Sequence, residues 1–172
     1  MDLILVRHPQ PLSEPGVCYG RLDLECEPHA LEAAASRLAG LAAGKRVFTS
    51  PLRRARDLAA RLTANPVPDD RLQELNFGDW EGRRWLDFDP EAVDAWSRGL
   101  PDSAPPHGET LTAMAQRLAD WLASLDRDGP PVLAVSHAGP IRVIRAALEG
   151  VPPITYFTLA IPFAHPIELR TD

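Results

Sequence analysis

The stretch Leu3-Ile4-Leu5-Val6-Arg7-His8-Pro9 decides the expected fold class of this chain. Its first four residues are apolar and partly β-branched, a run too short for a helix and stopped by Pro9, so they predict a strand buried on both faces. Arg7 and His8 then lie at the carboxyl end of this strand, where open α/β sheets bind their ligands. The alternative is a strand that simply becomes polar at the protein surface.

The rest of the chain alternates between strand-like and helix-like patterns. Helices are expected where apolar residues recur at helical spacing, and near a short segment flanked by prolines: 31–41, 52–62, 90–98, 109–125 and 141–148. Ser50 is expected to cap the second of these helices, with Pro51 at its first position. Short apolar runs predict further strands, the last two of them weak: 47–49, 132–135, 155–160 and 166–170.

This alternation predicts a parallel sheet with right-handed crossover connections. The expected fold class is therefore α/β, a three-layer α/β/α sandwich with a mostly parallel central sheet. Residues 1–172 are expected to form a single domain. Within it, residues 66–108, here called the excursion segment, have no sustained periodicity, contain three of the four tryptophans and are expected to pass over the active site.

Composition narrows the classes of function. The net charge of −6 argues against a nucleic-acid partner, because binding nucleic acid needs a basic stripe. No segment approaches the apolar length of a membrane span and the N-terminus lacks a signal segment, so a cytoplasmic protein without membrane partners is expected. Cys18 and Cys26 have no CxxC spacing and no nearby histidine pair, which predicts reduced thiols and no zinc site.

Functional side chains follow three of the expected strands. They are Arg7 with His8, the segment Ser50–Arg54, and His137. Parallel strands place these ends at one edge of the sheet, and two of them are also helix N-termini, which attract anions. An arginine in the first turn of a helix leans back towards the N-terminus, so Arg53 or Arg54 can reach this edge. Guanidinium groups added to two helix N-termini predict a phosphate pocket.

Four motifs appear in order over nearly the whole chain: Leu5–His8, Ser50–Ala55, Glu74–Gly82 and Ser136–Gly139. Each motif is common by itself, but the four in register resemble the histidine phosphatase superfamily, in its phosphoglycerate mutase-like branch. The resemblance implies a phosphoglycerate mutase-like fold. It also implies phosphoryl transfer through a phosphohistidine, with a small phosphorylated metabolite as partner and no metal or other cofactor.

The resemblance also assigns roles to individual residues. It implies that His8 is the nucleophile and that Arg7, Arg54 and His137 bind the phosphoryl group, the family spacing selecting Arg54 over Arg53. A neutral imidazole can attack phosphorus only if one ring nitrogen keeps its lone pair and the other holds the ring in place. Guanidinium groups and a second histidine then meet the charge on the transferring phosphoryl oxygens.

The leaving alkoxide needs a proton, which a carboxylic acid can donate. The resemblance implies that Glu74 is this acid and later the base for the water that hydrolyses the phosphohistidine. Asp79 and Glu81 are nearby competitors for the role. The other histidines, His29, His107 and His165, are expected to be surface or packing residues.

Among the phosphatases, three segments are similar to α-ribazole phosphatases, which act late in the assembly of the cobalamin nucleotide loop: Gly16–Asp23, Pro51–Ala55 and Phe77–Gly82. This similarity implies that α-ribazole 5'-phosphate is the substrate. It further implies that Tyr19, and Trp80 or Trp85, contact a flat base; the alternative is that the tryptophans only fix the excursion segment. Two further residues are expected to line the substrate site: Gly20 and Ala138.

Other functions remain open at this point. A phosphoglycerate mutase is disfavoured because the chain is short and lacks the mutases' longer insertions, and a broad-specificity phosphatase is a further alternative. Pro9 stands where the family usually has glycine, and proline has no N–H to donate. This departure leaves open a noncatalytic module that binds phosphorylated ligands. The oligomeric state is not indicated by the sequence.

Overall fold

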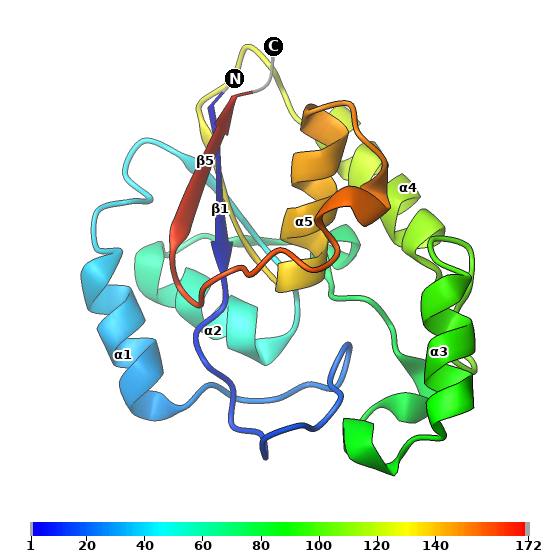
Figure 1. The fold of residues 1–172 in the computed structure, drawn as a ribbon. Coiled ribbons are helices and arrows are strands. Elements are labelled where there is room, and N and C mark those ends of the chain that lie inside the picture. The colour runs from blue at the N-terminus through cyan, green and yellow to red at the C-terminus, as the bar shows by residue number, and fades with distance from the viewer. Residues whose placement is uncertain (1, 171–172) are drawn as a thin grey trace.

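The computed structural model describes residues 2–170, in which a central five-stranded sheet has helices on both faces (Figure 1). The strand order is β3-β2-β4-β1-β5, and every neighbouring pair is parallel except β1 and β5. The strands are β1 (Asp2–Arg7), β2 (Arg46–Thr49), β3 (Val67–Pro68), β4 (Val132–Ser136) and β5 (Pro166–Arg170). The expected α/β class with a mostly parallel sheet is confirmed.

Strand β1 separates two layers of hydrophobic core. Leu3 and Leu5 belong to one cluster and Ile4 and Val6 to the other, because successive side chains of a strand point to opposite faces. All four side chains are at most 7% exposed. The opening strand is therefore buried on both faces, as its apolar run predicts.

The described residues form five helices. They are α1 (Pro28–Arg37), α2 (Arg53–Leu62), α3 (Pro90–Arg98), α4 (Leu111–Ala123) and α5 (Ala138–Leu148). Four of them cover these two faces, whereas α3 lies apart from the sheet (Figure 1). Side chains of α1 and α2 pack in the cluster that contains Ile4, whereas those of α4 and α5 pack in the cluster that contains Leu3. The first helix ends earlier than expected, since residues 38–44 form turns in which Gly40 and Gly44 have positive φ angles.

Two of the expected local structures are wrong. Ser50 does not cap α2, because the helix begins at Arg53 and its N-cap is Leu52, without a side-chain cap. The strand expected over 155–160 is absent: residues Pro153–Tyr156 form a 3₁₀ turn, η4. Two successive prolines, Pro152 and Pro153, lack the N–H groups that a strand needs and favour a turn instead.

The excursion segment is more ordered than its sequence pattern suggests. Its first residues form β3, which extends the sheet beside β2, and three short 3₁₀ helices precede α3: η1 (Asp70–Leu72), η2 (Gly78–Trp80) and η3 (Trp85–Asp87). Its aromatic side chains contact one another at ring-centroid distances of 5.1–6.3 Å: Phe77, Trp80, Trp85, Phe88 and Trp96. These contacts favour the interpretation that the tryptophans hold the excursion segment in place over the one in which they contact a flat base.

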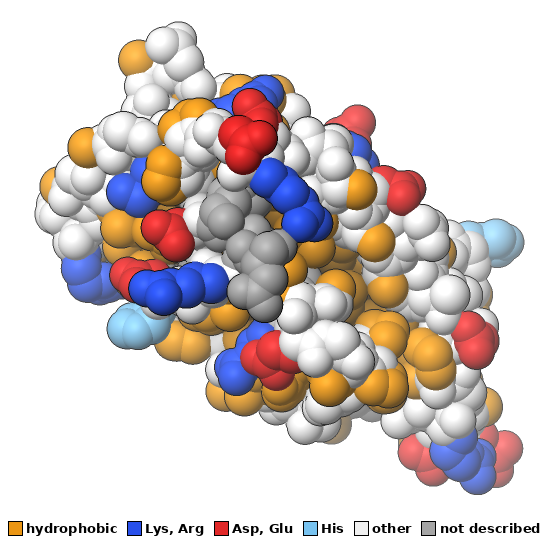
Figure 2. Space-filling view, turned by 90° about the horizontal axis from the view of Figure 1, so that it is seen from above, with side chains coloured by type: hydrophobic (Ala, Val, Ile, Leu, Met, Phe, Trp, Pro, Cys, Tyr) orange, Lys and Arg blue, Asp and Glu red, His pale blue; other side chains and the backbone are white. Residues whose placement is uncertain are grey.

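Other features of the described residues concern the surface and the thiols. At the end of the molecule that carries the termini, basic and acidic side chains are intermixed (Figure 2). Between residues 2 and 170, no helix combines the length and hydropathy of a membrane span. Cys18 and Cys26 are free thiols, and burial raises their pKa values to about 12 and about 11.

Candidate active site

His8 directly follows β1, and its backbone N–H continues the pairing with β4 by donating to the Ser136 carbonyl at 2.9 Å. The side chain is 1% exposed, and its Nδ1 lies 2.6 Å from the Pro9 carbonyl oxygen. A carbonyl only accepts hydrogen bonds, so Nδ1 carries the proton and Nε2 keeps its lone pair. Proline has no backbone N–H but keeps its carbonyl, and the Pro9 carbonyl orients the His8 ring.

His137 is the N-cap residue of α5 and is fully buried. Its Nε2 lies 2.8 Å from the hydroxyl of Ser50, and that oxygen accepts the Leu52 N–H at 3.3 Å. The Ser50 hydroxyl can donate to Nε2, and in that tautomer the ring proton of His137 lies on Nδ1. The real role of Ser50 is therefore to orient His137, whose ring centroid lies 5.0 Å from that of His8.

Arg54 lies in the first turn of α2 and is fully buried, whereas Arg53 points outward to an ion pair with Glu25. The Arg54 guanidinium donates to two loop carbonyls, those of Leu22 at 2.7 Å and Gly20 at 2.5 Å. These bonds hold the loop after β1 against α2. Of the two arginines that the helix pattern left open, the structure brings Arg54 into the site.

Arg7, the last residue of β1, is held by the C-terminal part of the chain. Its Nη1 donates to the Ile161 carbonyl at 2.6 Å, and its guanidinium carbon lies 3.7 Å from the ring centroid of Phe163. The Phe163 ring is also 5.6 Å from that of His8. Sequence analysis missed Phe163, because no apolar periodicity links this irregular tail to the first strand.

Three buried donors in this site have no partner. Six buried side-chain nitrogens between residues 2 and 170 lack a hydrogen bond, and three of them are Arg7 Nε, Arg54 Nε and His137 Nδ1. Buried polar groups are normally paired, and each unpaired donor costs about 1–3 kcal/mol. Three such donors next to His8 fit an anion with several oxygen acceptors.

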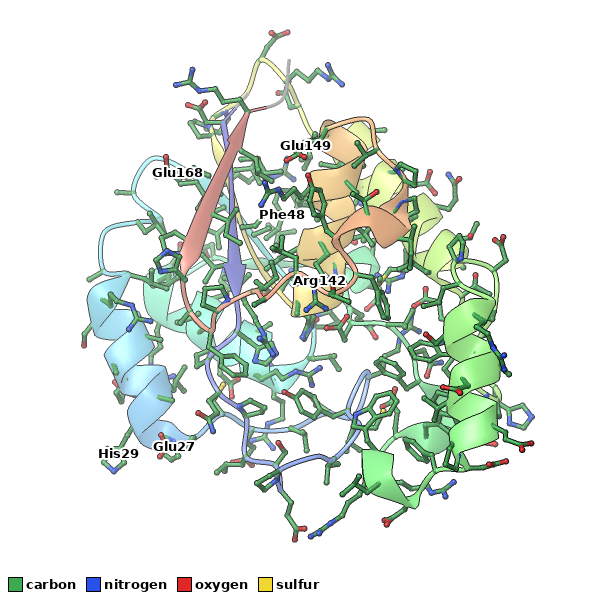
Figure 3. All side chains as sticks on the ribbon, in the orientation of Figure 1. Glu27, His29, Phe48, Arg142, Glu149 and Glu168 are labelled. Atoms are coloured by element: carbon green, nitrogen blue, oxygen red, sulfur yellow. The ribbon has the colours of Figure 1, made fainter. Side chains whose placement is uncertain are left out.

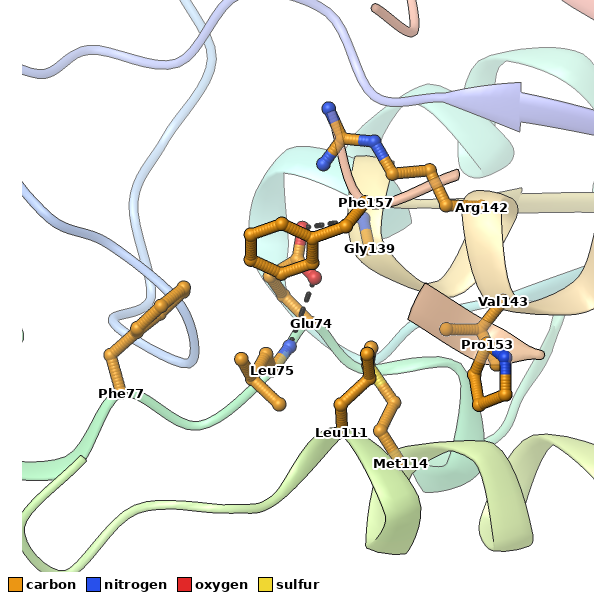
Figure 4. A pocket seen from close by; sticks show the side chains of 10 residues that line it. All are labelled: Glu74, Leu75, Phe77, Leu111, Met114, Gly139, Arg142, Val143, Pro153 and Phe157. Atoms are coloured by element: carbon orange, nitrogen blue, oxygen red, sulfur yellow. Dashed lines mark hydrogen bonds between the residues drawn. The ribbon is translucent and has the colours of Figure 1, made fainter. Parts of the chain in front are cut away.

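Glu74 lies between η1 and η2, and two backbone amides fix its carboxyl group (Figure 4). Oε1 accepts the Leu75 N–H at 2.9 Å, and Oε2 accepts the Gly139 N–H at 3.1 Å in the first turn of α5. Burial lowers the pKa values of Arg7 and Arg54, and the charge of the Glu74 carboxylate opposes this, so the three groups are within electrostatic reach. Glu74 thus binds the start of α5, two residues after His137, within electrostatic reach of both arginines.

The two competing carboxylates are engaged elsewhere. Glu81 accepts backbone N–H groups from the loop after β1, including that of Arg21 at 2.8 Å, and from Phe77 at 3.0 Å. Asp79 is more than half exposed and pairs with His107 at 2.9 Å. The geometry therefore favours Glu74 among the three carboxylates as the proton donor.

The expected substrate-site residues are only partly brought together. The Tyr19 ring centroid lies 5.4 Å from the Arg54 guanidinium carbon, and Ala138 begins α5 beside His137. Gly20 contributes its carbonyl to Arg54, and a Cβ at this position would lie 2.0 Å from the Leu75 carbonyl oxygen, so close backbone packing requires glycine here. Trp80 is 5% exposed within the aromatic cluster.

The remaining histidines lie at the surface. His29, at the start of α1, His107 and His165 are all exposed (Figure 3 labels His29 at the outer edge of α1). Within residues 2–170, no three or more His, Cys, Asp or Glu side chains gather in a way that could hold a metal ion.

Comparison with known proteins identifies the family. The model of the histidine phosphatase superfamily (branch 1) matches residues 3–172, nearly the whole chain. The chain belongs to the histidine phosphatase superfamily. The four motifs that suggested this family are the segments that carry His8, Arg54, Glu74 and His137.

Individual relatives of this chain include proteins described as phosphatases and as mutases. The adenosylcobalamin/alpha-ribazole phosphatase of Salmonella typhimurium is 36% identical over 116 residues, covering 62% of this chain and 57% of the relative. The alpha-ribazole phosphatase structure from Shigella flexneri has a TM-score of 0.89 at 25% identity, covering 100% of this chain and 91% of that one. A Thermus thermophilus structure described as a phosphoglycerate mutase has a TM-score of 0.79 at 30% identity, covering 98% and 92%. The chain spans 46–57% of the length of the curated relatives with the strongest matches.

The electrostatics of the site keep both of its histidines neutral. Burial holds the pKa of His8 well below its usual value, and the Arg54 and Arg7 guanidinium groups lower it further. Burial acts in the same direction on the pKa of His137, with Arg54 and His8 as additional causes. A neutral His8 keeps the Nε2 lone pair that a nucleophile needs.

These pKa shifts predict that the enzyme loses stability in mild acid. Below pH 6.5, the usual histidine pKa, the unfolded chain binds protons at His8 and His137 that the folded chain does not bind. The free energy of unfolding should therefore fall with decreasing pH, by about 1.4 kcal/mol per pH unit for each histidine. Urea unfolding between pH 7 and pH 5 measures this slope.

The matched test of that slope is His137→Asn against His29→Asn. His137→Asn should reduce the slope of the unfolding free energy against pH by about 1.4 kcal/mol per pH unit, the contribution of one proton. His29→Asn, at an exposed histidine, should leave the slope unchanged. A wild-type stability that stays constant from pH 7 to pH 5 would contradict the prediction.

Gly139 gives a second prediction, because its lack of a side chain makes room for Glu74. A Cβ at this position would lie 2.1 Å from Glu74 Oε1 and 3.1 Å from Cδ. We expect Gly139→Ala to displace the carboxyl group and lower kcat by roughly 10²-fold, the smaller end of the effect of a general acid. Steady-state hydrolysis of an alkyl phosphate measures this, with phosphate inhibition as the readout for an intact anion site.

The control is Gly129→Ala, in a turn between α4 and β4. A Cβ there meets only the flexible Asp126 side chain, with 3.0 Å as the shortest distance. Equal kcat values for the two variants would show that Gly139 does not act through Glu74.

Proposed function

We propose that this chain is a phosphomonoester hydrolase that forms a phosphohistidine on His8. The observation that carries the proposal is the set of three unpaired buried nitrogens, Arg7 Nε, Arg54 Nε and His137 Nδ1. Their residues all act on His8, His137 through a ring contact at 5.0 Å and the two arginines through their charge. A phosphoryl group offers acceptors to all three. His8 has its remaining lone pair on Nε2, the atom that would attack phosphorus.

In the first step, Nε2 of His8 forms a bond to phosphorus as the bond to the ester oxygen breaks. The Nδ1 proton stays on the ring, directed at the Pro9 carbonyl, so the phosphorylated imidazole carries a positive charge that this carbonyl stabilises. The guanidinium groups of Arg7 and Arg54 and the His137 N–H meet the charge on the phosphoryl oxygens. Glu74 gives its proton to the leaving alkoxide.

In the second step, Glu74 accepts a proton from water while the water oxygen attacks the phosphohistidine. The bond between phosphorus and Nε2 breaks, inorganic phosphate leaves, and Glu74 is again protonated for the next cycle. Each carboxylate oxygen accepts one backbone N–H and keeps a second lone pair, so the amides orient the group without occupying it. All of these steps use side chains of the chain itself, and we propose a metal-independent mechanism.

We further propose α-ribazole 5'-phosphate as the substrate, which would place the enzyme in cobalamin biosynthesis. The support is the similarity to alpha-ribazole phosphatases in both sequence and structure, together with the sequence motifs that contain Tyr19 and Trp80. The relative described as a phosphoglycerate mutase keeps a mutase as the second candidate. A noncatalytic module is disfavoured, because Glu74 is held in place within electrostatic reach of both arginines.

The test has two stages. The wild-type protein should release phosphate from p-nitrophenyl phosphate and carry an acid-labile phosphoryl group on His8 when the reaction is stopped in base. Protein that binds phosphate but neither releases it from the ester nor becomes phosphorylated would overturn the enzyme proposal.

The second stage chooses the substrate. Turnover of α-ribazole 5'-phosphate is compared with that of 3-phosphoglycerate supplied with 2,3-bisphosphoglycerate, scoring free phosphate against 2-phosphoglycerate. We expect fast phosphate release from α-ribazole 5'-phosphate only. Formation of 2-phosphoglycerate would favour the mutase, and equally slow hydrolysis of both substrates would contradict the α-ribazole assignment.

A further inference from the structure

A pocket of about 100 Å³ opens beside the Glu74 carboxyl group (Figure 4). Phe77 and Phe157 form aromatic walls, and aliphatic side chains of α4 and α5 lie opposite them, among them Leu111, Met114 and Val143. None of these side chains has a role in the phosphoryl transfer described above. The pocket is therefore a part of the molecule that the proposed mechanism does not explain.

Two ionisable side chains line the pocket among mostly apolar ones. Its only charged lining residues are Glu74 and Arg142. Arg142 donates from Nε to the Leu159 carbonyl at 2.7 Å, and burial lowers its pKa while the Glu74 carboxylate opposes this. Arg142 is thus engaged by a backbone carbonyl, and Glu74 is neutral while it holds the proton for the leaving group, so the remaining lining, which is apolar, decides what binds.

The pocket is also continuous with the reaction site, because Glu74 belongs to both. A proton donor must lie within hydrogen-bond reach of the leaving oxygen, so whatever is attached to that oxygen must lie beside the Glu74 carboxyl. The apolar walls begin at this carboxyl, with Leu75 next in sequence and Gly139 bonded to it.

We propose that this pocket binds an uncharged apolar group, the size of one ring, on the leaving-group side of the phosphomonoester. This inference rests on the proposed phosphatase function and adds the substrate class to it. The volume of about 100 Å³ is of the order of a cavity of roughly 150 Å³ that holds benzene in another protein. A ring or a branched alkyl group fits such a space, whereas a carboxylate would lose hydration against the apolar walls.

The excursion segment fixes the two aromatic walls. Trp96 of α3 lies 6.0 Å from the ring centroid of Phe77 and 6.0 Å from that of Phe157. Phe77 also contacts Trp85 at 5.6 Å. Trp85, one of the two tryptophans expected to touch a flat base, thus contacts a wall of the pocket together with Trp96, and neither lines the pocket itself.

The test compares esters whose leaving alcohols have similar acidity, so that chemistry contributes little to the difference. The probes are ethyl phosphate, 2-phenylethyl phosphate and 3-phosphoglycerate. Burial of a phenyl ring should raise kcat/KM for 2-phenylethyl phosphate over ethyl phosphate by roughly 10- to 100-fold. The carboxylated 3-phosphoglycerate should be no better than ethyl phosphate.

Two aromatic truncations at neighbouring positions form the matched pair. Phe157→Ala removes a wall and should narrow the ratio between the phenylethyl and ethyl esters by about 5-fold or more. Tyr156→Ala removes a ring that binds Glu149 and Arg145 outside the pocket and should leave the ratio unchanged. Phe157→Leu, a milder change, serves if the alanine variant does not fold.

The outcomes separate this inference from the function on which it rests. If all esters are inert and His8 is never phosphorylated, the phosphatase proposal fails and the pocket assignment fails with it. If ethyl and 2-phenylethyl phosphate are hydrolysed with equal kcat/KM, or if 3-phosphoglycerate is preferred, only the pocket assignment is overturned. A ratio that Tyr156→Ala reduces as much as Phe157→Ala also overturns it.

Discussion

Substitution of His8 by glutamine is expected to abolish phosphate release, with kcat falling by roughly 10⁴- to 10⁶-fold, the scale seen when a nucleophile is removed. Glutamine can still reach the Pro9 carbonyl with an N–H, as Nδ1 of His8 does at 2.6 Å. It has no nucleophilic lone pair to replace that of Nε2. The substitution therefore removes the covalent step and retains a polar side chain of similar length.

Phosphate binding should survive the same substitution. The unpaired donors of Arg7, Arg54 and His137 belong to other residues, and two of them are held by separate contacts, Arg54 by loop carbonyls and His137 by Ser50. Calorimetric titration with inorganic phosphate should give a dissociation constant within about tenfold of the wild-type value, a difference of about 1.4 kcal/mol.

The control is His29→Gln at an exposed histidine in α1, which should hydrolyse p-nitrophenyl phosphate at the wild-type rate. Turnover by His8→Gln within tenfold of the wild type would show that another residue is the nucleophile. Loss of both turnover and phosphate binding would instead indicate that the variant disturbs the anion site, and unfolding curves distinguish that case.

Much of this architecture follows from local sequence patterns because strong physical constraints act within single elements. The alternation of Leu3 and Leu5 with Ile4 and Val6 is sufficient to predict a doubly buried strand, and the structure places the two pairs in separate clusters. Helix α3 was expected over residues 90–98 and is observed at Pro90–Arg98, since Asp89 caps it and proline is favoured at the first position.

Other features depend on contacts between distant residues, which one sequence does not display. Ser50 has the sequence context of a helix cap, but its hydroxyl meets His137, which is 87 residues away. The two-residue strand β3 forms only because β2 offers an open edge, and its Pro68 argues against a strand locally. In both cases tertiary contacts override local preference.

The candidate site likewise combines residues that the sequence predicts with residues that only the fold brings there. Family spacing selected Arg54 over Arg53, and the structure gives the physical reason, because Arg54 is buried at the site and Arg53 is paired at the surface. Arg142 and Phe163 were missed. Arg142 follows Gly139, whose N–H binds Glu74, by three positions on α5, a helical offset that could have suggested it, whereas Phe163 reaches His8 from an irregular tail without such a signal.

Substitution of Glu74 by glutamine is expected to lower kcat for an alkyl phosphate by roughly 10²- to 10⁴-fold, the usual contribution of a general acid or base. The substituted amide cannot deliver a proton to the alkoxide or accept one from water. Glutamine also replaces one of the two oxygens that accept the Leu75 and Gly139 N–H groups, so we expect an additional loss of stability of about 1–3 kcal/mol.

The leaving group separates the two roles of Glu74. p-Nitrophenolate is a weak base and leaves without a proton, so phosphorylation of His8 by p-nitrophenyl phosphate should remain fast in Glu74→Gln. Hydrolysis of the phosphohistidine still needs a base for water and should become limiting. Rapid-mixing experiments should therefore show a burst of one p-nitrophenolate per active site, followed by slow turnover and accumulation of phosphorylated His8.

Asp79→Asn provides the matched control, because Asp79 is the exposed competitor that pairs with His107. We expect this variant to turn over alkyl and aryl esters as the wild type does. A burst of p-nitrophenolate in Asp79→Asn but not in Glu74→Gln would show that Asp79, and not Glu74, is the acid-base residue. Equal losses on alkyl and aryl esters without a burst would mean that Glu74 supports the site only structurally, since a proton donor must matter more when the leaving group is a stronger base.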